Sequence, residues 1–487
     1  MAKYVPIAFA AGWLVFGDWL GGLCLAVLAL VWISLPAEEG PPVLALAATM
    51  QWTQVTIGYF YHSVTGRQLE ATIRADYRTM VLIGLGCVVA LVAGLVAGRR
   101  IVDRFPAKTT VRPANALTFK VLVLVYVVFT VVLGSIILSN YDFGGFQMAL
   151  VALSYLRLGL LYLLFRRFVK RERWSMIVGL LAVEIVMGIT GFYAGFREPL
   201  IMAALAFLEF FDSRNLRHWA TIGLLGVVAT SLGVIWIGVR VPYRERFVED
   251  EKFKDNRAAR IDALQTAVGL WANQSHEDLM IDCDGFVQRM WTIYYPALVL
   301  DRVPSVLPHT DGQLMLDTLK FTFEPRIFFP NKPYIQSDSQ MVRKYSGVMV
   351  SGEESDTDIA FGYAAESYID FGIPLMFVPS FIWALFIGVA CSLIFREYHH
   401  RDMAVAVVTV IGWFSLYLFE RSWTKTFGFG GTLLIYAGGL CYILDRLWYE
   451  KFKNLYLGGL DADGEVVGGV EVSDAMPIHL QPQTHTK

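Results

Sequence analysis

The sequence predicts an all-α, polytopic membrane protein with about twelve transmembrane helices and one large polar segment outside the membrane. Hydrophobic residues make up 55% of the 487 residues and charged residues 17%, and the mean hydropathy is +0.49. These values depart from the average soluble protein toward the membrane class. Two further observations support this fold class, namely many apolar runs of helical length and a single polar segment at residues 240–372.

The apolar runs are counted on the template of a transmembrane helix, which needs roughly 20 apolar residues to cross about 30 Å of hydrocarbon. The first two runs are the weakest, because Asp18 interrupts a stretch too long for one helix and barely long enough for two. One tilted helix or a re-entrant pair are the alternatives there. The predicted spans are 5–17, 19–35, 41–61, 79–98, 117–139, 146–165, 174–194, 198–212, 218–239, 374–395, 402–419 and 428–447.

Lys and Arg residues in the short loops set the predicted orientation. Successive basic clusters are separated by an even number of predicted spans, so one assignment places all of them in the cytoplasm together with both termini. The polar segment then lies outside. The basic clusters lie at 99–112, 166–173, 214–217, 396–401 and 446–453.

This topology divides the chain into four predicted parts. Residues 1–239 form the N-terminal transmembrane helices, 240–372 a large outer loop, and 373–449 the C-terminal transmembrane helices. Residues 450–487 form a cytoplasmic tail, whose Gly, Asp, Gln and Pro content beyond 458 predicts disorder. A long loop inside a compact protein is usually functional or disordered, and 240–372 is rich in aromatic, Pro and Gly residues, which favours function.

A second set of arginines lies outside in this topology, against the usual bias. Arg74 and Arg78 stand four residues apart, so a short outer helix would place them on one face. Arg197 lies in a very short turn between two spans, which holds its guanidinium at the membrane surface. Because a guanidinium stays charged and offers paired donors to phosphate oxygens, converging arginines would form a diphosphate clamp. The alternative is ordinary snorkelling or pairing with nearby acids. The set comprises Arg67, Arg74, Arg78, Arg197, Arg240, Arg244 and Arg246.

Two stretches of the outer segment carry further candidates. The run Pro325-Arg-Ile-Phe-Phe-Pro-Asn-Lys-Pro333 cannot be regular helix, since its prolines fix the backbone, and it presents Arg326 and Lys332 on an aromatic-flanked loop. The acidic run 351–358 leads toward Glu366 and an apolar span, which would place Asp358 or Glu366 at the mouth of a cavity. Structural roles for both stretches remain open, and the acidic run lacks the spacing of an EF-hand.

Other polar residues in or beside the spans have a structural explanation as their simplest one. Glu184 is costly inside a span unless it faces other helices, and Glu420, Arg421 and Lys425 form a polar outer end between the last two spans. The sequence has no P-loop, no Gly-x-Gly-x-x-Gly opening a helix and no His-Glu-x-x-His, so we expect no nucleotide chemistry in the cytoplasm.

The Gly-Phe-Arg197 turn, the Glu324-to-Pro333 element and the Glu366-Ser-Tyr-Ile-Asp-Phe-Gly-Ile-Pro374 stretch together resemble the Wzy-type oligosaccharide repeat-unit polymerases of bacterial surface polysaccharide synthesis. The resemblance implies a C-type glycosyltransferase fold in the inner membrane, working on its periplasmic face without a metal or other cofactor. Donor and acceptor would be undecaprenyl diphosphate-linked oligosaccharides, a chain-length regulator protein is a possible partner, and no nucleic acid is expected.

The resemblance implies catalytic and substrate-binding roles for several of these residues. Arg197 and Arg326 are expected to stabilise charge on the leaving diphosphate. A carboxylate beside an apolar wall is expected to accept the acceptor's proton, with Glu366 the first choice and Asp358 the second. Aromatic side chains such as Tyr334, Trp291 and Tyr294 would be sugar platforms, although packing is the simpler role. The expected substrate-binding residues are Arg67, Arg74, Arg78, Arg240, Arg244, Lys332 and Tyr334.

Two other functions fit the same pattern. An O-antigen ligase shares the fold and the lipid donor but transfers the glycan to a lipid A core. A lipid-linked oligosaccharide flippase would use the arginines to bind headgroups and would need no base.

Overall fold

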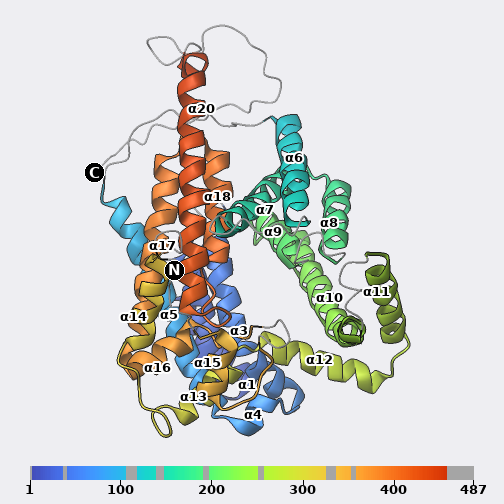
Figure 1. The fold of residues 1–487 in the computed structure, drawn as a ribbon, viewed down its shortest axis with the longest axis vertical. Coiled ribbons are helices and arrows are strands. Elements are labelled where there is room, and N and C mark those ends of the chain that lie inside the picture. Colours follow the sequence, from blue (N-terminus) through green and yellow to red (C-terminus); the bar gives the residue numbers. More distant parts are fainter. Residues whose placement is uncertain are drawn as a thin grey trace.

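The computed structural model describes residues 3–36, 41–105, 118–138, 147–189, 197–249, 257–324, 329, 336–352 and 358–457, and these residues form helices and connections without any strand. Figure 1 shows the chain of helices. The helices are α1 (Tyr4–Phe16), α2 (Trp19–Ser34), α3 (Val43–Thr65), α4 (Glu70–Arg74), α5 (Tyr77–Asp103), α6 (Phe119–Leu138), α7 (Gln147–Lys170), α8 (Trp174–Ile189), α9 (Arg197–Glu209), α10 (Leu216–Glu249), α11 (Arg257–Ala272), α12 (His276–Met290), α13 (Tyr294–Arg302), α14 (Gln313–Phe323), α15 (Asp338–Ser346), α16 (Tyr363–Leu375), α17 (Phe377–Glu397), α18 (Arg401–Phe414), α19 (Trp423–Lys425) and α20 (Leu440–Leu457), with π-helical stretches at Thr426–Gly430 and Leu433–Gly439 between α19 and α20.

Each predicted span coincides with a helix over most of its described part, in order α1, α2, α3, α5 to α10, α17, α18 and the helical run that ends in α20, although 402–419 extends five residues past the end of α18. The prediction of an all-helical fold is confirmed for the described residues, and five of their helices are long and apolar enough to be candidate membrane spans. A count of twelve spans is not confirmed, since helices such as α9 and α18 have only 13 and 14 residues. The five are Tyr77–Asp103, Phe119–Ile136, Leu216–Arg240, Phe377–Glu397 and Trp423–Lys451.

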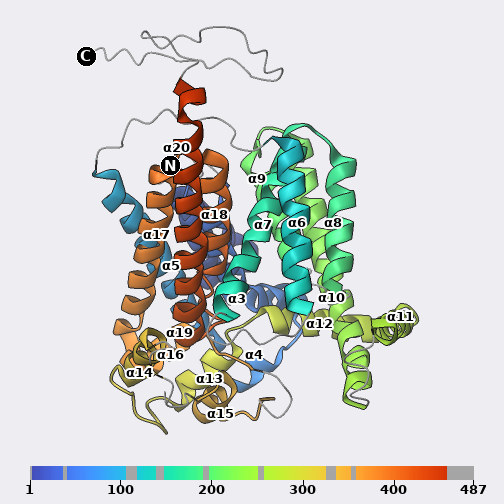
Figure 2. The same ribbon diagram turned by 45° about the horizontal axis from the view of Figure 1, so that its top comes forward.

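The long helices run side by side, and the shorter helices gather at one end of them. Figure 2 shows α4 and α11 to α16 at this end, which we call the loop end. We call the opposite end the basic end, because the predicted inner clusters meet there. The side chain of Arg396, at the end of α17, donates to the carbonyl of Val102 near the end of α5 at 3.3 Å. His400, ahead of α18, contacts Asp445 of α20 at 2.8 Å.

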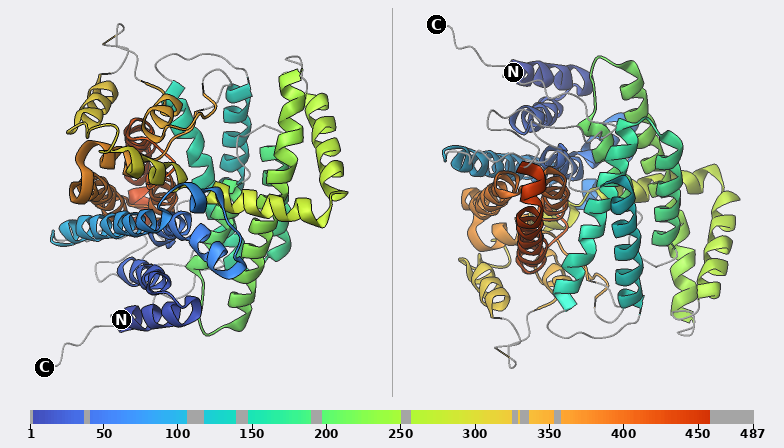
Figure 3. Two further views of the ribbon diagram at one scale, coloured as in Figure 1. Left: turned by 90° about the horizontal axis from the view of Figure 1, so that it is seen from below. Right: turned by 90° about the horizontal axis from the view of Figure 1, so that it is seen from above.

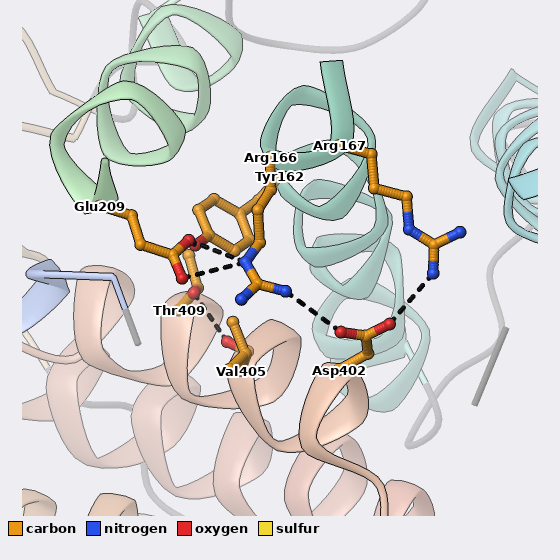
Figure 4. A network of polar contacts seen from close by, with 7 residues as sticks. All are labelled: Tyr162, Arg166, Arg167, Glu209, Asp402, Val405 and Thr409. Atoms are coloured by element: carbon orange, nitrogen blue, oxygen red, sulfur yellow. Dashed lines mark hydrogen bonds and ion pairs between the residues drawn. The ribbon is translucent and has the colours of Figure 1, made fainter. Parts of the chain in front are cut away.

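A polar network joins α7, α9 and α18 at the basic end (Figure 4). The Arg166 guanidinium lies between two carboxylates, 2.8 Å from Glu209 and 3.2 Å from Asp402. Arg167 also pairs with Asp402, at 3.0 Å, and Tyr162 donates to Glu209. Glu209 and Asp402 are largely buried, and the arginines of α7 balance their charges. Part of the basic cluster at 166–173 therefore fastens three helices together.

Seen along the helices, the molecule has two neighbouring groups (Figure 3). One contains α2, α3, α5, α17, α18 and α20, with α1 packed on its edge, and the other contains α6 to α10. The closest packing is between α5 and α17, where glycines let the two backbones approach. A side chain added at Gly98 would meet the carbonyl of Leu385 at 2.3 Å, and one added at Gly388 would meet that of Leu95 at 2.5 Å. Small residues where two helices meet are typical of close helix pairs in membranes.

We expect Gly98→Ala to lower stability by about 1–3 kcal/mol, because the added methyl group overlaps the α17 backbone. Gly179→Ala in α8 is the matched control, since nothing lies within 4 Å of its added atom. That change is expected to be neutral or to stabilise by up to about 1 kcal/mol through helix propensity. Thermal unfolding of the purified proteins, followed by tryptophan fluorescence, distinguishes the two, and equal melting temperatures would contradict the close packing.

The predicted outer loop differs in detail from the structure. Its described part is largely helical, in α11 to α16, and its predicted start at Arg240 lies inside the continuous helix α10. Its predicted end coincides with a break in α16, where Gly372 has φ 61° and the next residue is extended. The boundary at 449 falls inside α20, and residues 458–487 of the predicted tail lie outside the described residues.

Candidate functional site

Three of the predicted clamp arginines at the loop end are held by three different acids. Arg67 pairs with Asp284 of α12, and Arg78 pairs with Asp18 between α1 and α2. The hydrogen bond from Arg67 also lowers the pKa of Asp284, despite an opposing effect of burial. Arg74 pairs with Glu70 on its own short helix at 3.1 Å. The first two contacts tie the chain after α3 and the start of α5 to neighbouring elements, whereas the third stays within α4. None of the three contacts joins one of these arginines to another.

The prediction that Arg74 and Arg78 share one helical face is wrong. Helix α4 ends at Arg74, and Ala75 adopts an extended conformation with φ −141° and ψ 154°. A new helix starts after Asp76, whose side chain accepts the N–H of Thr79 as a helix cap. Helical spacing therefore does not apply across this break.

A different arginine stands at the centre of a polar cluster at the loop end. Arg197 is the first residue of α9, and its guanidinium lies 3.6 Å from Glu198 and 3.7 Å from Glu420. At these distances the contacts are ion pairs rather than full hydrogen bonds, so the planar fork keeps donors available. The side chain of Arg197 is 45% exposed, compared with 18% for Glu198 and 25% for Glu420. The Arg197 side chain is therefore more exposed to solvent than either acid that it contacts.

Glu420 belongs to the connection between α18 and α19, residues 415–422, which packs into the protein. Gln54 of α3 donates to the carboxylate of Glu420, and Gln51 accepts the N–H of Leu418 at 2.8 Å. The start of α16 holds the other side of the connection, as the N–H of Tyr363 donates to the carbonyl of Arg421 at 2.7 Å. Buried amides on α3 thus fix the position of Glu420 relative to Arg197.

Glycine is required at position 362, where this connection meets α16. Gly362 has φ 86°, a conformation that side chains rarely adopt. A Cβ there would also lie 2.4 Å from the Cα of Phe419. The backbone of the connection therefore lies directly against the start of α16.

Arg421 adds a second cation to the cluster. Its guanidinium lies 4.4 Å from the ring centre of Tyr417 and 4.8 Å from that of Phe429, and it donates to the carbonyl of Phe414 at 2.8 Å. Tyr155 of α7 packs edge-on against Phe414 at 4.5 Å. An arginine stacked on aromatic rings keeps its charge while its orientation is fixed.

Several polar atoms around Arg197 and Glu420 are buried without a hydrogen-bond partner among the described residues. They are the Tyr417 hydroxyl, one carboxylate oxygen of Glu198 and the side-chain oxygen of Gln54. A buried polar atom left unsatisfied costs about 1–3 kcal/mol, so such atoms indicate a place for water or a polar ligand. We name Arg197, Glu198, Tyr417, Glu420 and Arg421 the Arg197 cluster.

Glu366, the first choice for the base, lies deeper in the protein. Its carboxylate accepts the N–H of Trp423 at 2.7 Å, at the start of α19, and the residue is 8% exposed. Burial raises the pKa of Glu366 well above its usual value, and the N–H of Trp423 opposes this only in part. The direction of this shift suits a general base, but the contact also gives Glu366 a structural role in holding α19. Its catalytic role stays a prediction.

Asp358, the second choice, has a different partner. Lys425 bridges Asp358 at 2.7 Å and Asp338 at 2.8 Å, and Asp358 also accepts the N–H of Ser339 at 3.1 Å. These contacts fasten the stretch before α16 to α15 and α19. Asp358 is thus part of a salt bridge at the loop end that does not include Arg197 or its two acidic partners.

The remaining predicted residues are only partly covered. Arg326, Lys332 and Tyr334 lie outside the described residues, as does the side chain of Arg244. Arg240 lies on α10 and takes part in an interaction within the protein. Trp291 is buried and donates to the carbonyl of Val55 at 3.0 Å, which supports packing rather than a sugar platform.

Of the Arg197 cluster, the sequence predicts only Arg197 as a site residue. Glu420 and Arg421 appear in the sequence as a polar outer end between two spans, with a structural contact as the simplest explanation. Charged residues beside apolar spans are the signal in the sequence that points to them. Among the described residues, no group of three or more His, Cys, Asp or Glu side chains is arranged to hold a metal ion.

A family model described as Domain of unknown function (DUF8712) matches residues 54–400, more than half of the chain. The chain belongs to this family. The DUF8712 match includes Arg197 and Glu198 and ends before Glu420 and Arg421. No curated protein and no solved structure matches the chain.

Proposed function

We propose that this DUF8712 protein polymerises undecaprenyl diphosphate-linked oligosaccharide repeat units into a bacterial surface polysaccharide. The reaction takes place at the loop end, which faces the periplasm from the inner membrane. The growing glycan is transferred from its diphosphate lipid to a hydroxyl of the incoming repeat unit. This proposal combines the resemblance in the sequence with the chemistry of the Arg197 cluster.

The observation that carries the proposal is the open guanidinium of Arg197 together with a second fixed cation, Arg421, since both act electrostatically on the same Tyr417 hydroxyl. Breaking the bond between sugar and diphosphate develops negative charge on the departing oxygen. Fixed guanidinium groups stabilise this charge more in the transition state than in the ground state, which accelerates the reaction. Arg197 keeps donors free because its two acidic partners stand at 3.6 and 3.7 Å. Arg326 remains a proposed third contact to the diphosphate.

Glu198 is the carboxylate of this cluster best placed to act as the base. One of its oxygens faces Arg197, and the other is buried without a partner among the described residues. That second oxygen can accept the proton of a substrate hydroxyl that enters the cluster. We therefore place Glu198 ahead of Glu366 and Asp358, whose carboxylates bind Trp423 and Lys425.

The membrane orientation is open to a direct labelling test. Val306, between α13 and α14 at the loop end, is 63% exposed, and Phe105, at the basic end, is 60% exposed. In a Cys283→Ser background, a membrane-impermeant maleimide is expected to label Val306→Cys in intact spheroplasts. Phe105→Cys is expected to react only after permeabilisation. The reverse pattern would place the Arg197 cluster in the cytoplasm and exclude a periplasmic polymerase.

A gene deletion distinguishes the proposed reaction from its two alternatives. Cells without the protein are expected to carry single repeat units in place of long polysaccharide, and the intact gene should restore long chains. A ligase would instead leave long chains on undecaprenyl diphosphate, unattached to lipid A. A flippase would leave the unpolymerised lipid-linked units on the cytoplasmic side of the membrane.

A further inference from the structure

A groove between α2 and α5 lies near the basic end, opposite to the Arg197 cluster. Its volume is about 480 Å³, and α2 contributes Leu30 and Ser34, one helical turn apart. The described residues that line it include no acid. The groove runs along α5, one of the five helices suited to cross a membrane, so its apolar wall lies at the depth of lipid chains.

One face of α5 supplies most of the wall. Val89, Val92 and Val96 follow each other at helical spacing, and the same face continues into Arg100 and Arg104. From Val89 to Arg100 the helix rises roughly 16 Å, which is close to the thickness of one leaflet of hydrocarbon, about 15 Å. The apolar part therefore matches the length of an acyl chain, and the two arginines stand where a headgroup begins.

The two arginines are available for a ligand. Neither Arg100 nor Arg104 has an ion-pair partner among the described residues, whereas the neighbouring Arg99 pairs with Asp103 at 3.6 Å. Two guanidinium groups four residues apart on one helical face can contact a single phosphate together.

We propose that this groove binds an anionic phospholipid of the leaflet at the basic end, with an acyl chain along Val89 to Val96 and the phosphate on Arg100 and Arg104. The proposal does not depend on the reaction at the Arg197 cluster. An anionic headgroup, rather than a zwitterionic one, is favoured because two cations meet there and none of the described lining residues is an acid.

Native mass spectrometry of the full-length protein tests the site, with phosphatidylglycerol and phosphatidylcholine of identical chains as probes. The wild type should retain phosphatidylglycerol preferentially. The double variant Arg100→Gln/Arg104→Gln should bind it about thirtyfold more weakly, as expected for two basic residues near a membrane surface. Arg99→Gln is the matched control and should bind normally.

A second variant tests the groove without changing its charge. Ala97, which also lines the groove, is replaced by Phe to fill it, and phosphatidylglycerol retention should fall although both arginines remain. The proposal would be overturned if the wild type bound both lipids equally, or if either the double variant or Ala97→Phe retained phosphatidylglycerol unchanged. It would also be overturned if the wild type preferred a polyprenyl phosphate over phosphatidylglycerol. Two acids, Glu38 and Glu39, follow Ser34 closely in the sequence. A Glu38→Gln/Glu39→Gln variant should retain phosphatidylglycerol as the wild type does. A large increase in retention would mean that these acids neutralise the two arginines, and it would overturn the proposal.

Discussion

The Arg197→Lys variant is expected to lose about a hundredfold in polymer-forming rate while its amount in the membrane stays near normal. Removing one preorganised donor from a developing anion typically costs this much. Lys keeps the positive charge but offers a single ammonium in place of a planar fork, so the paired contact with phosphate oxygens is lost. Because the wild-type side chain is 45% exposed, the substitution leaves little buried charge without a partner.

Polymer length on a gel, normalised to the protein in the membrane, measures the effect. Arg99→Lys at the basic end is the control, because Arg99 is also a partly exposed arginine paired with an acid, and it should leave polymer unchanged. Normal polymer from Arg197→Lys would remove the diphosphate contact from the proposed mechanism. Equal loss of protein and polymer would instead indicate a structural role for Arg197.

The Glu198→Gln variant is expected to lose about a hundredfold to ten-thousandfold in rate, the usual contribution of a general base. Gln has the same size and keeps an acceptor near Arg197, but it cannot take a proton from the substrate hydroxyl. Binding of the lipid-linked substrate should therefore persist while transfer fails.

Glu366→Gln is the informative comparison. Its side-chain oxygen can still accept the N–H of Trp423, so this variant should fold and retain most of its activity if Glu366 holds α19. Glu366→Ala should instead destabilise the protein by about 1–3 kcal/mol, because that buried N–H loses its partner. Full activity in Glu198→Gln together with a steep loss in a stably folded Glu366→Gln would return the base role to Glu366.

Hydropathy alone located the helices well, because each predicted span coincides with a helix over most of its described part. The spacing of Arg74 and Arg78 predicts one helical face, but Asp76 between them is a residue type that often caps a helix start, and here it accepts the N–H of Thr79. Helical spacing does not extend across such a cap.

The Arg197 cluster was predicted only in part, for a physical reason. Arg197 and Glu420 are separated by more than 200 residues, and their contact depends on how the connection at 415–422 packs against α3 and α16. Hydropathy and local spacing contain no information on that packing. The inward position of Glu366 likewise follows from Trp423 starting a helix beside it, which an isolated acidic residue in the sequence does not reveal.

The measurement that tests the central claim most directly uses the purified protein in liposomes with undecaprenyl diphosphate-linked repeat units extracted from its native host. Gel electrophoresis of the released glycans should show a ladder of chain lengths that grows with time. The ladder should be absent with Arg197→Lys and present with Arg99→Lys. Liposomes in which the wild-type protein binds or moves the lipid-linked units but leaves every glycan at one repeat unit would contradict the proposed polymerase.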